Sequence, residues 1–255
     1  MTILLFLAAL AADPAAPAGP PAMVTMVKGS VTLVEGKTRS PAPAPPFLLS
    51  ASQSLDLAAG AHVVLLRQGG AFTVDGPRQV DPESFHSAAN TSDKVGSLLE
   101  KRTSLASAGV ARGGTVALTR PIPGAPVLAL GDIRWSCDHC GPQTVVLADL
   151  HADARLWSGS GEGAVRYDGA ALNPGVYGLK IGDAEFSVRV APRTEADAIL
   201  AGAHLDTLPT PTDRAAATAG ALLLGGFPTD AIAALEGGGL TDLVPDYEKI
   251  AGLRP

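Results

Sequence analysis

The sequence predicts a mainly β protein, built from two β modules with a connector helix between them and a short helical region at the C-terminal end. Short runs of β-favouring residues, separated by glycine and Asp-Gly turn signals, fill residues 23–82 and 115–191. Apolar residues at helical spacing occupy residues 83–114 and 192–255 instead. The 255 residues include 29 glycines and 21 prolines, which favours many short elements over long helices.

The N-terminal residues predict a signal peptide over 1–12 and a disordered Pro/Ala linker over 13–22. A short apolar run ends in Ala9-Leu10-Ala11, which offers the small residues of a signal peptidase site, so we expect cleavage after Ala11 or Ala12. No Lys or Arg precedes the run, and a buried strand is the alternative. Spanning a bilayer takes about 20 apolar residues, and no segment reaches that length. We therefore expect a periplasmic or secreted protein without a transmembrane segment.

The first β module shows five apolar runs bounded by turn residues. They are Val31–Val34, Phe47–Leu49, Ser54–Ala58, Val63–Leu66 and Phe72–Val74. The runs follow the order G-x-V-x-x-x-x-G, L-x-x-G-x-x-V-x-L and G-G-x-F-x-x-x-G-P, which resembles the FecR-like domain of bacterial envelope proteins. The resemblance implies a sensing or scaffolding module rather than an enzyme. Within the module, the Pro-rich stretch Ser40–Pro46 predicts an exposed extended loop.

The connector helix is expected over residues 92–106, where Val95, Leu98, Leu99 and Leu105 recur at helical spacing. FecR-like proteins often carry such a helix after the β module. Shorter strand signals then follow at 115–119, 127–130, 133–135, 144–147, 155–157 and 165–167.

Residues 115–191 predict the second β module. Its clearest hairpin joins runs 176–181 and 184–190 through the two-residue turn Gly182-Asp183. The segment Leu172–Tyr177 resembles the L-x-P-G-x-Y corner of fibronectin type III and related sandwiches, and Trp135 matches the tryptophan of those modules. The resemblance implies an Ig-like β-sandwich in which Trp135 and Tyr177 are structural and the Tyr177 hydroxyl binds the backbone. The alternative is a smaller β-roll that continues the first module.

The helical region over 192–255 predicts four short helices. Thr194–Asp197 approximates a capping box, Thr212 is expected to cap a second helix, and Pro228 and Pro245 are expected to begin the third and fourth. The pattern resembles half of a tetratricopeptide repeat, although Gly237–Gly239 breaks it and leaves a degenerate helical hairpin. Short Ala-rich helices are marginal alone, so they must pack on the sandwich or on another protein. We expect the partner surface on the first β module or on this helical region, and favour the helical region, because the sandwich offers no charged cleft or aromatic patch. Residues 23–191 are expected to stay folded without the helices.

The pair Cys137 and Cys140 is the only motif that could carry chemistry. A c-type haem would need His directly after the second Cys, where Gly141 stands, and a zinc site would need a second Cys or His pair. A thioredoxin-like pair would begin a helix, and the sequence predicts a strand there. We therefore predict a local disulfide of structural rather than catalytic importance. The polar segment Asp149–Asp153 falls between two strands and predicts a solvated turn.

These observations predict a non-enzymatic, exported envelope protein that acts in sensing, scaffolding or protein interaction. The net charge of −6 and the lack of any Lys/Arg cluster exclude nucleic-acid binding. No catalytic, cofactor-binding or metal-binding residue is predicted, and an envelope protein is the expected partner. FecR-like proteins often have a membrane anchor that this sequence lacks, which favours scaffolding over direct transcriptional signalling. One alternative is a thiol-redox accessory protein that uses Cys137 and Cys140. Another is a cell-wall or carbohydrate-binding module with Trp135, Trp157, Tyr167 and Tyr177 as its aromatic platform.

Overall fold

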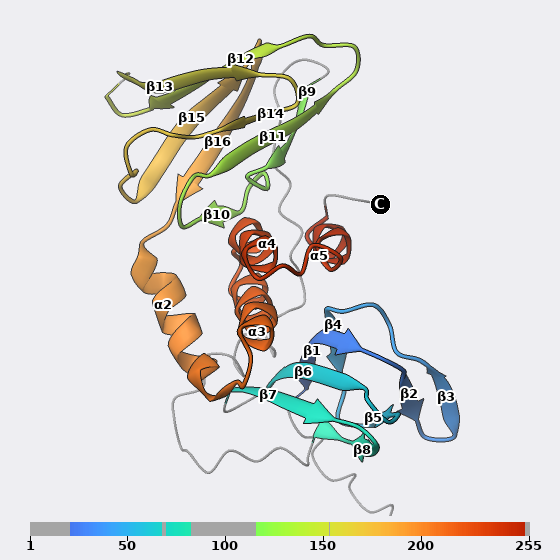
Figure 1. Cartoon of the computed structure of the whole chain (residues 1–255). Coiled ribbons are helices and arrows are strands. Elements are labelled where there is room, and N and C mark those ends of the chain that lie inside the picture. The colour runs from blue at the N-terminus through green and yellow to red at the C-terminus, as the bar shows by residue number, and fades with distance from the viewer. Residues whose placement is uncertain (1–20, 68–69, 83–115, 153, 253–255) are drawn as a thin grey trace, which may run out of the picture.

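The computed structural model describes residues 21–67, 70–82, 116–152 and 154–252. Within them the protein is mainly β, as predicted: sheets that are antiparallel except for one short parallel pair form two modules, and short helices follow at the C-terminal end (Figure 1). The expected signal peptide and connector helix lie outside these residues. No helix in this part of the chain is long and apolar enough to cross a membrane.

The first β module consists of two four-stranded antiparallel sheets. One sheet has the order β4-β1-β6-β7 and the other β3-β2-β5-β8. The strands are β1 (Ala22–Lys28), β2 (Val31–Glu35), β3 (Thr38–Pro41), β4 (Phe47–Leu49), β5 (Gln53–Leu57), β6 (His62–Arg67), β7 (Gly70–Asp75) and β8 (Arg78–Val80). The two sheets share an aliphatic core that includes Val24, Leu49, Leu55, Val63 and Leu65.

Three strands of this module differ from expectation. The strand β1 carries no apolar alternation, because residues from Ala22 to Met26 are buried on both faces of the sheet. The strands β3 and β8 are mainly polar and are held by pairing with β2 and β5. The Pro-rich stretch is not exposed throughout: Pro45 and Pro46 are buried, because they lead directly into β4 at the edge of the first sheet.

The second β module pairs a five-stranded sheet, β10-β16-β15-β12-β13, with a three-stranded sheet, β14-β11-β9. Its strands are β9 (Val116–Arg120), β10 (Pro126–Val127), β11 (Asp132–Cys137), β12 (Gln143–Asp149), β13 (Ala154–Gly161), β14 (Ala164–Arg166), β15 (Gly175–Ile181) and β16 (Ala184–Val190). Trp135 and Tyr177 are buried in the core that both sheets share. The strand expected over 127–130 is short, because the Leu128 N–H donates to the Asp230 carboxylate instead of to a neighbouring strand.

The helical region contains α2 (Arg193–Gly202), the 3-10 turn η2 (Leu205–Thr207), α3 (Pro211–Leu224), α4 (Pro228–Gly237) and α5 (Val244–Ile250). The expected capping box at 194–197 does not form, because α2 begins at Arg193 and its N-cap is Pro192, which has no side-chain acceptor. Helix α3 begins earlier than predicted, since the Thr210 hydroxyl accepts from the Asp213 N–H and Pro211 fills the first helical position.

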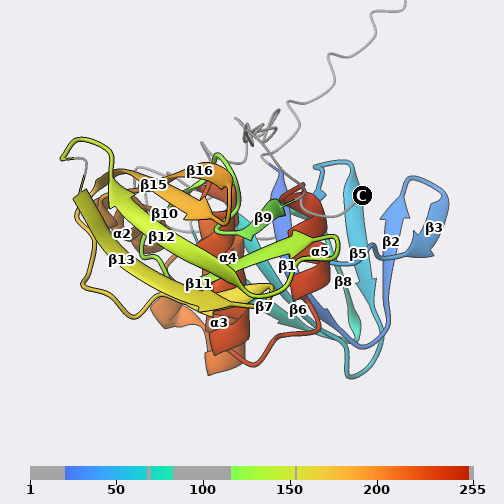
Figure 2. The ribbon, with the colours of Figure 1, turned by 90° about the horizontal axis from the view of Figure 1, so that it is seen from above.

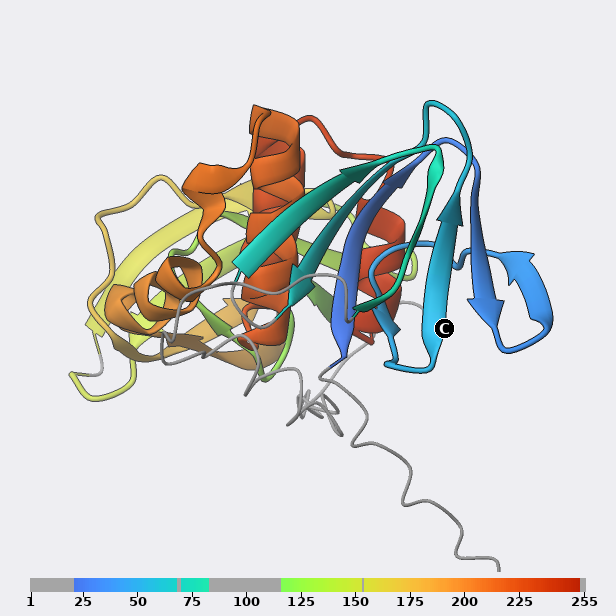
Figure 3. The same cartoon turned by 90° about the horizontal axis from the view of Figure 1, so that it is seen from below.

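Helix α3 lies against β1 and β6 of the first module (Figure 3). Small side chains on the helix allow this close approach. Ala216, Ala217 and Ala219 are fully buried along it. At Gly220 the helix touches the sheet, and a Cβ atom there would collide with the side-chain methyl of Thr25 and reach 2.9 Å from Cδ1 of Leu66. The Ala-rich composition therefore permits a short distance between helix and sheet.

The helical region lies between the two β modules (Figures 1 and 2). Its apolar side chains form one core with Met23, Met26, Val64 and Leu66 from the first module and with Ile122 from the second. The chain itself therefore covers the apolar faces of these helices, and the partner surface expected on this region stays a prediction. Short helices that bury little area alone gain their stability from this packing.

A buried ion-pair cluster joins the helices to the second module. The Arg120 side chain is 6% exposed and donates to Glu236 of α4 at 2.7 Å and to Glu248 of α5 at 2.9 Å. Burial lowers the pKa of Arg120, but the hydrogen bonds and charges of the two glutamates outweigh that effect, so the pKa of the guanidinium is raised above its ordinary value. The arginine is therefore a fixed cation at the junction.

Candidate functional site

The candidate site lies on the outer face of the second module's five-stranded sheet, the face that points away from the three-stranded sheet. Along β12 and β15, Val145, Leu147, Tyr177 and Leu179 point into the module's core, so their neighbours in sequence point outward. An antiparallel sheet with one solvated face is normally polar on that face. Here the outward residues include valine, alanine and glycine, and Val176 is 41% exposed.

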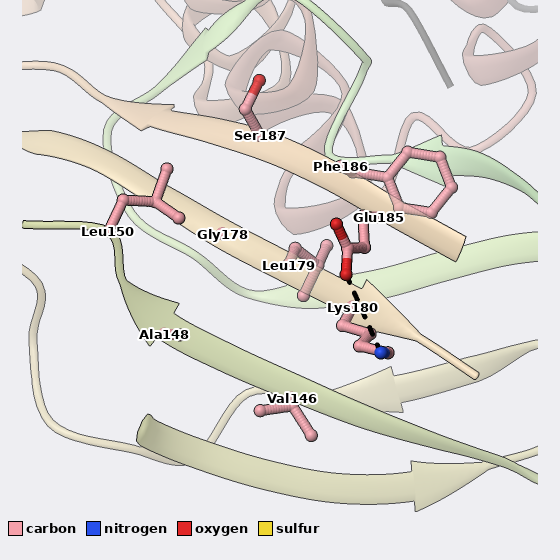
Figure 4. A pocket seen from close by; sticks show the side chains of 9 residues that line it. All are labelled: Val146, Ala148, Leu150, Gly178, Leu179, Lys180, Glu185, Phe186 and Ser187. Atoms are coloured by element: carbon pink, nitrogen blue, oxygen red, sulfur yellow. Dashed lines mark ion pairs between the residues drawn. The ribbon is translucent and has the colours of Figure 1, made fainter. Parts of the chain in front are cut away.

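A hollow of about 430 Å³ opens on this outer face (Figure 4). It is lined by Val146, Ala148, Leu150, Gly178, Leu179, Lys180, Glu185, Phe186 and Ser187. Leu150 lies at one end with 57% of its surface exposed. A Cβ atom on Gly178 would lie 2.8 Å from Cδ2 of Leu150, so the glycine makes room for the leucine against the sheet. The hollow therefore combines a small-residue floor with a protruding aliphatic side chain.

The charges at the hollow cancel. Lys180 Nζ lies 3.7 Å from Glu185 Oε1, and the two side chains are 51% and 71% exposed. Figure 4 shows the pair away from Leu150, toward the other end of the hollow. An exposed pair of this kind adds little to stability. The hollow thus carries no net charge, and its remaining polar side chain is the hydroxyl of Ser187.

The turn that carries Leu150 is fixed by Asp149. The Asp149 Oδ1 atom accepts from the backbone N–H of His151 at 2.8 Å and of Ala152 at 3.2 Å. These hydrogen bonds hold the pKa of Asp149 below its usual value of 3.8. The turn that the sequence marks as polar and solvated therefore also presents the most exposed large apolar side chain of the described chain. In the sequence, the one indication of this exposed apolar side chain is a leucine within an otherwise polar turn.

The predicted cysteine pair forms a disulfide between Cys137 and Cys140, as expected. It closes the loop that follows β11, and the residues between and after the cysteines are turns and extended chain rather than a helix. A reactive thiol is usually stabilised by a helix N-terminus or a nearby cation. Neither cysteine lines the hollow on the outer face.

The aromatic side chains serve the module's own structure. The Tyr177 hydroxyl donates to the Asn173 carbonyl at 2.7 Å. Trp157 packs edge-on to Tyr167 with ring centroids 5.3 Å apart, and its indole N–H donates to Asp168 at 2.6 Å. Trp135 and Tyr177 are buried. The four aromatic residues named in the sequence analysis thus lie apart from the hollow and do not line it.

A second hollow, of about 490 Å³, lies where α4 meets the second module. The polar residues that line it are Arg120, Asp132, Arg166, Thr229, Asp230 and Glu236. Burial raises the pKa of Asp230 to about 6 even though the Leu128 N–H donates to it. Thr229 is occupied as well, because its Oγ1 accepts from the Ile122 N–H. Most of these groups already hold the junction together, which leaves the outer face as the stronger candidate.

Among the described residues, no three His, Cys, Asp or Glu side chains converge on a point that could hold a metal ion. Comparison with known proteins gives no match to any protein family, to any curated protein or to any solved structure. The site must therefore be interpreted from its own geometry. Its lining is mainly apolar, with Lys180, Glu185 and Ser187 as the polar side chains, and is therefore suited to binding apolar groups.

Proposed function

We propose that the protein is a non-enzymatic protein-interaction module that binds an extended, aliphatic segment of a partner protein on the outer face of its second β module. The observation that carries the proposal is the apolar hollow with Leu150 exposed beside Gly178. Exposed apolar patches on otherwise polar surfaces are typical of interaction sites. Removing an exposed leucine from water stabilises the complex with a partner that covers it.

The chemistry of the lining favours an uncharged aliphatic occupant. Lys180 and Glu185 form an ion pair with each other. An acidic or a basic segment would therefore have to compete with this pair for an opposite charge. A carbohydrate is usually bound on an aromatic platform, and Phe186 is the one aromatic side chain in this lining. The small side chains at Ala148 and Gly178 leave room for the side chains of an extended segment to approach the sheet.

We place this activity in the cell envelope. The resemblance of residues 23–82 to FecR-like domains and the apolar N-terminal run over 1–12 support export. The disulfide between Cys137 and Cys140 supports the same location, because such bonds persist in oxidising compartments. An exported protein with a scaffolding or sensing role then binds its envelope partner through the second module.

The test compares two exposed leucines. Proteins captured from envelope extract on the immobilised full chain are identified, purified and titrated against wild-type, Leu150→Asp and Leu48→Asp chains. Leu48 is the matched control, because it is 40% exposed on β4 of the first module. The proposal expects a loss of about 10-fold or more in affinity for Leu150→Asp and no change for Leu48→Asp. Equal affinity in all three chains, or equal loss in both variants, contradicts it.

A further inference from the structure

His62 stands between two carboxylates that come from different parts of the chain. Its Nδ1 atom lies 2.6 Å from Asp75 Oδ1 on β7, and its Nε2 atom lies 2.9 Å from Asp213 Oδ1 on α3. Asp75 is exposed, whereas the Asp213 side chain is only 3% exposed. Within the described chain no hydrogen bond reaches the other Asp213 oxygen, Oδ2. His62 therefore links the first β module to the first turn of the helix that covers it.

This geometry requires two donors on the imidazole ring. A neutral imidazole has one N–H and one lone pair, and an ionised carboxylate can only accept. With carboxylates at hydrogen-bond distance from both nitrogens, the neutral ring would set its lone pair against one of them. The imidazolium form donates to both and forms charge-assisted hydrogen bonds.

We infer that His62 is an imidazolium that clamps α3 to the first β module and releases it as the pH rises. When the ring loses its proton, one carboxylate loses its donor. For Asp213 that loss leaves a buried carboxylate without compensation, which is costly. The contact between the two regions is then weaker above the pKa of His62 than below it.

The charged groups around the ring agree with this direction. Burial lowers the pKa of His62, and the hydrogen bonds and charges of Asp75 and Asp213 outweigh it, so the pKa is raised above 6.5. Lys28 lies opposite His62 on β1 and is exposed to solvent. Arg214 on α3 donates to the Leu208 carbonyl. Since the pKa is higher in the folded chain than in the unfolded chain, the stabilisation is complete below pH 6.5 and is lost as the pH rises through the raised value.

The first experiment observes the ring itself in the full chain. Nitrogen-15 NMR of the imidazole at pH 7 should show both ring nitrogens of His62 protonated, and a titration should give a pKa above 6.5. The His62→Gln variant assigns the signal by its loss. A neutral ring at pH 7, with the shared proton on Asp213 instead, overturns the inference without requiring any variant to fold.

The second experiment observes the clamp. Amide hydrogen exchange in α3, corrected for intrinsic rates, is followed from pH 6 to 9 and compared with exchange in β12 and β15 of the second module. In the wild type we expect protection of α3 to fall by about 10-fold relative to β12 as the pH passes the His62 pKa. In His62→Gln and Asp213→Asn the pH dependence of α3 protection should vanish. In Asp75→Asn, which removes the exposed carboxylate partner of His62, part of the pH dependence should remain. The same pH dependence in wild type and His62→Gln contradicts the clamp.

Discussion

In the first β module, the sheet face outside the sandwich core carries Met23, Met26, Val64 and Leu66, and α3 covers all four. In the second module, the corresponding outer face carries Val146, Ala148, Leu150 and Gly178, and within the described chain no helix packs on it. The covered face holds large side chains that would be costly to leave in water. The open face holds smaller side chains at Ala148 and Gly178 beside the exposed Leu150, a patch that a folded chain tolerates and a partner can still use.

The difference teaches that an apolar sheet face has two outcomes in one chain. Where the apolar side chains are large, a helix of the same chain covers the face. The sequence of that helix suits this packing, because Gly220 allows contact with Thr25. Where the area is small, the face stays open. The helical region thus has a structural role in covering the first module, and the second module carries the exposed candidate site.

Removal of the helical region should have the largest effect. A chain that ends at Ala191 exposes the four large side chains of the covered face, each worth about 1.5–3 kcal/mol on burial, which approaches the whole stability of a typical domain. We expect the first module to lose cooperative unfolding and to bind the dye ANS, as judged by circular dichroism and fluorescence. A truncated chain that remains folded and monomeric would show that the helices are dispensable for the fold of residues 23–191.

A matched pair of leucine substitutions compares the two faces directly. Leu66→Ala on the covered face should cost about 2–5 kcal/mol of unfolding free energy, because it leaves a cavity beneath α3. Leu150→Ala on the open face should change that free energy by less than about 0.5 kcal/mol. Urea denaturation of both variants measures the difference. Equal costs would mean that the two faces are not distinct in solution.

The same comparison holds for a pair of glycines. Gly220→Ala should cost about 1–3 kcal/mol, because the added methyl meets Thr25 beneath the helix and the helix must shift. Gly178→Ala meets only the flexible end of Leu150 and should cost less than about 0.5 kcal/mol. Thermal melts decide between them. A neutral Gly220→Ala would indicate a looser helix–sheet contact than the structure has.

The smallest effect contrasts the two sides of β15. Tyr177→Phe removes the hydrogen bond to the Asn173 carbonyl and should cost about 1 kcal/mol. Val176→Thr, on the exposed side of the same strand, should be neutral within about 0.5 kcal/mol. If the tyrosine substitution is neutral and the threonine is not, the assignment of inner and outer faces is reversed.

The sequence predicts the fold class and the disulfide because both depend on local patterns. Alternation and turn glycines mark the hairpin 175–190, and the spacing of Cys137 and Cys140 allows a local bridge at a sequence separation of three. The strand β1 escapes such analysis, since burial on both faces removes alternation. The packing partner of α3 also cannot be predicted from the sequence. An apolar stripe shows that a helix must pack against another element, but it does not identify that element.

The candidate site was missed for the same reason. Leu150 lies in a polar turn and Gly178 lies in a strand with no distinguishing pattern. The two residues become neighbours only because β12 and β15 pair in the register Ala148↔Gly178. His62 and Asp213 are separated by 151 positions and have no shared motif, so their contact follows only from the packing of α3 on β6.

The most direct test of the contrast between the two faces is hydroxyl-radical footprinting of the full chain with mass spectrometry. Methionine reacts faster than leucine with such radicals, so protection of methionine is informative. We predict that Met23 and Met26 stay unmodified in the native chain while Leu150 is modified, and that a bound partner protects Leu150 alone. Rapid modification of both methionines, or protection of Leu150 in the isolated chain, would contradict the division into a covered face and an open one.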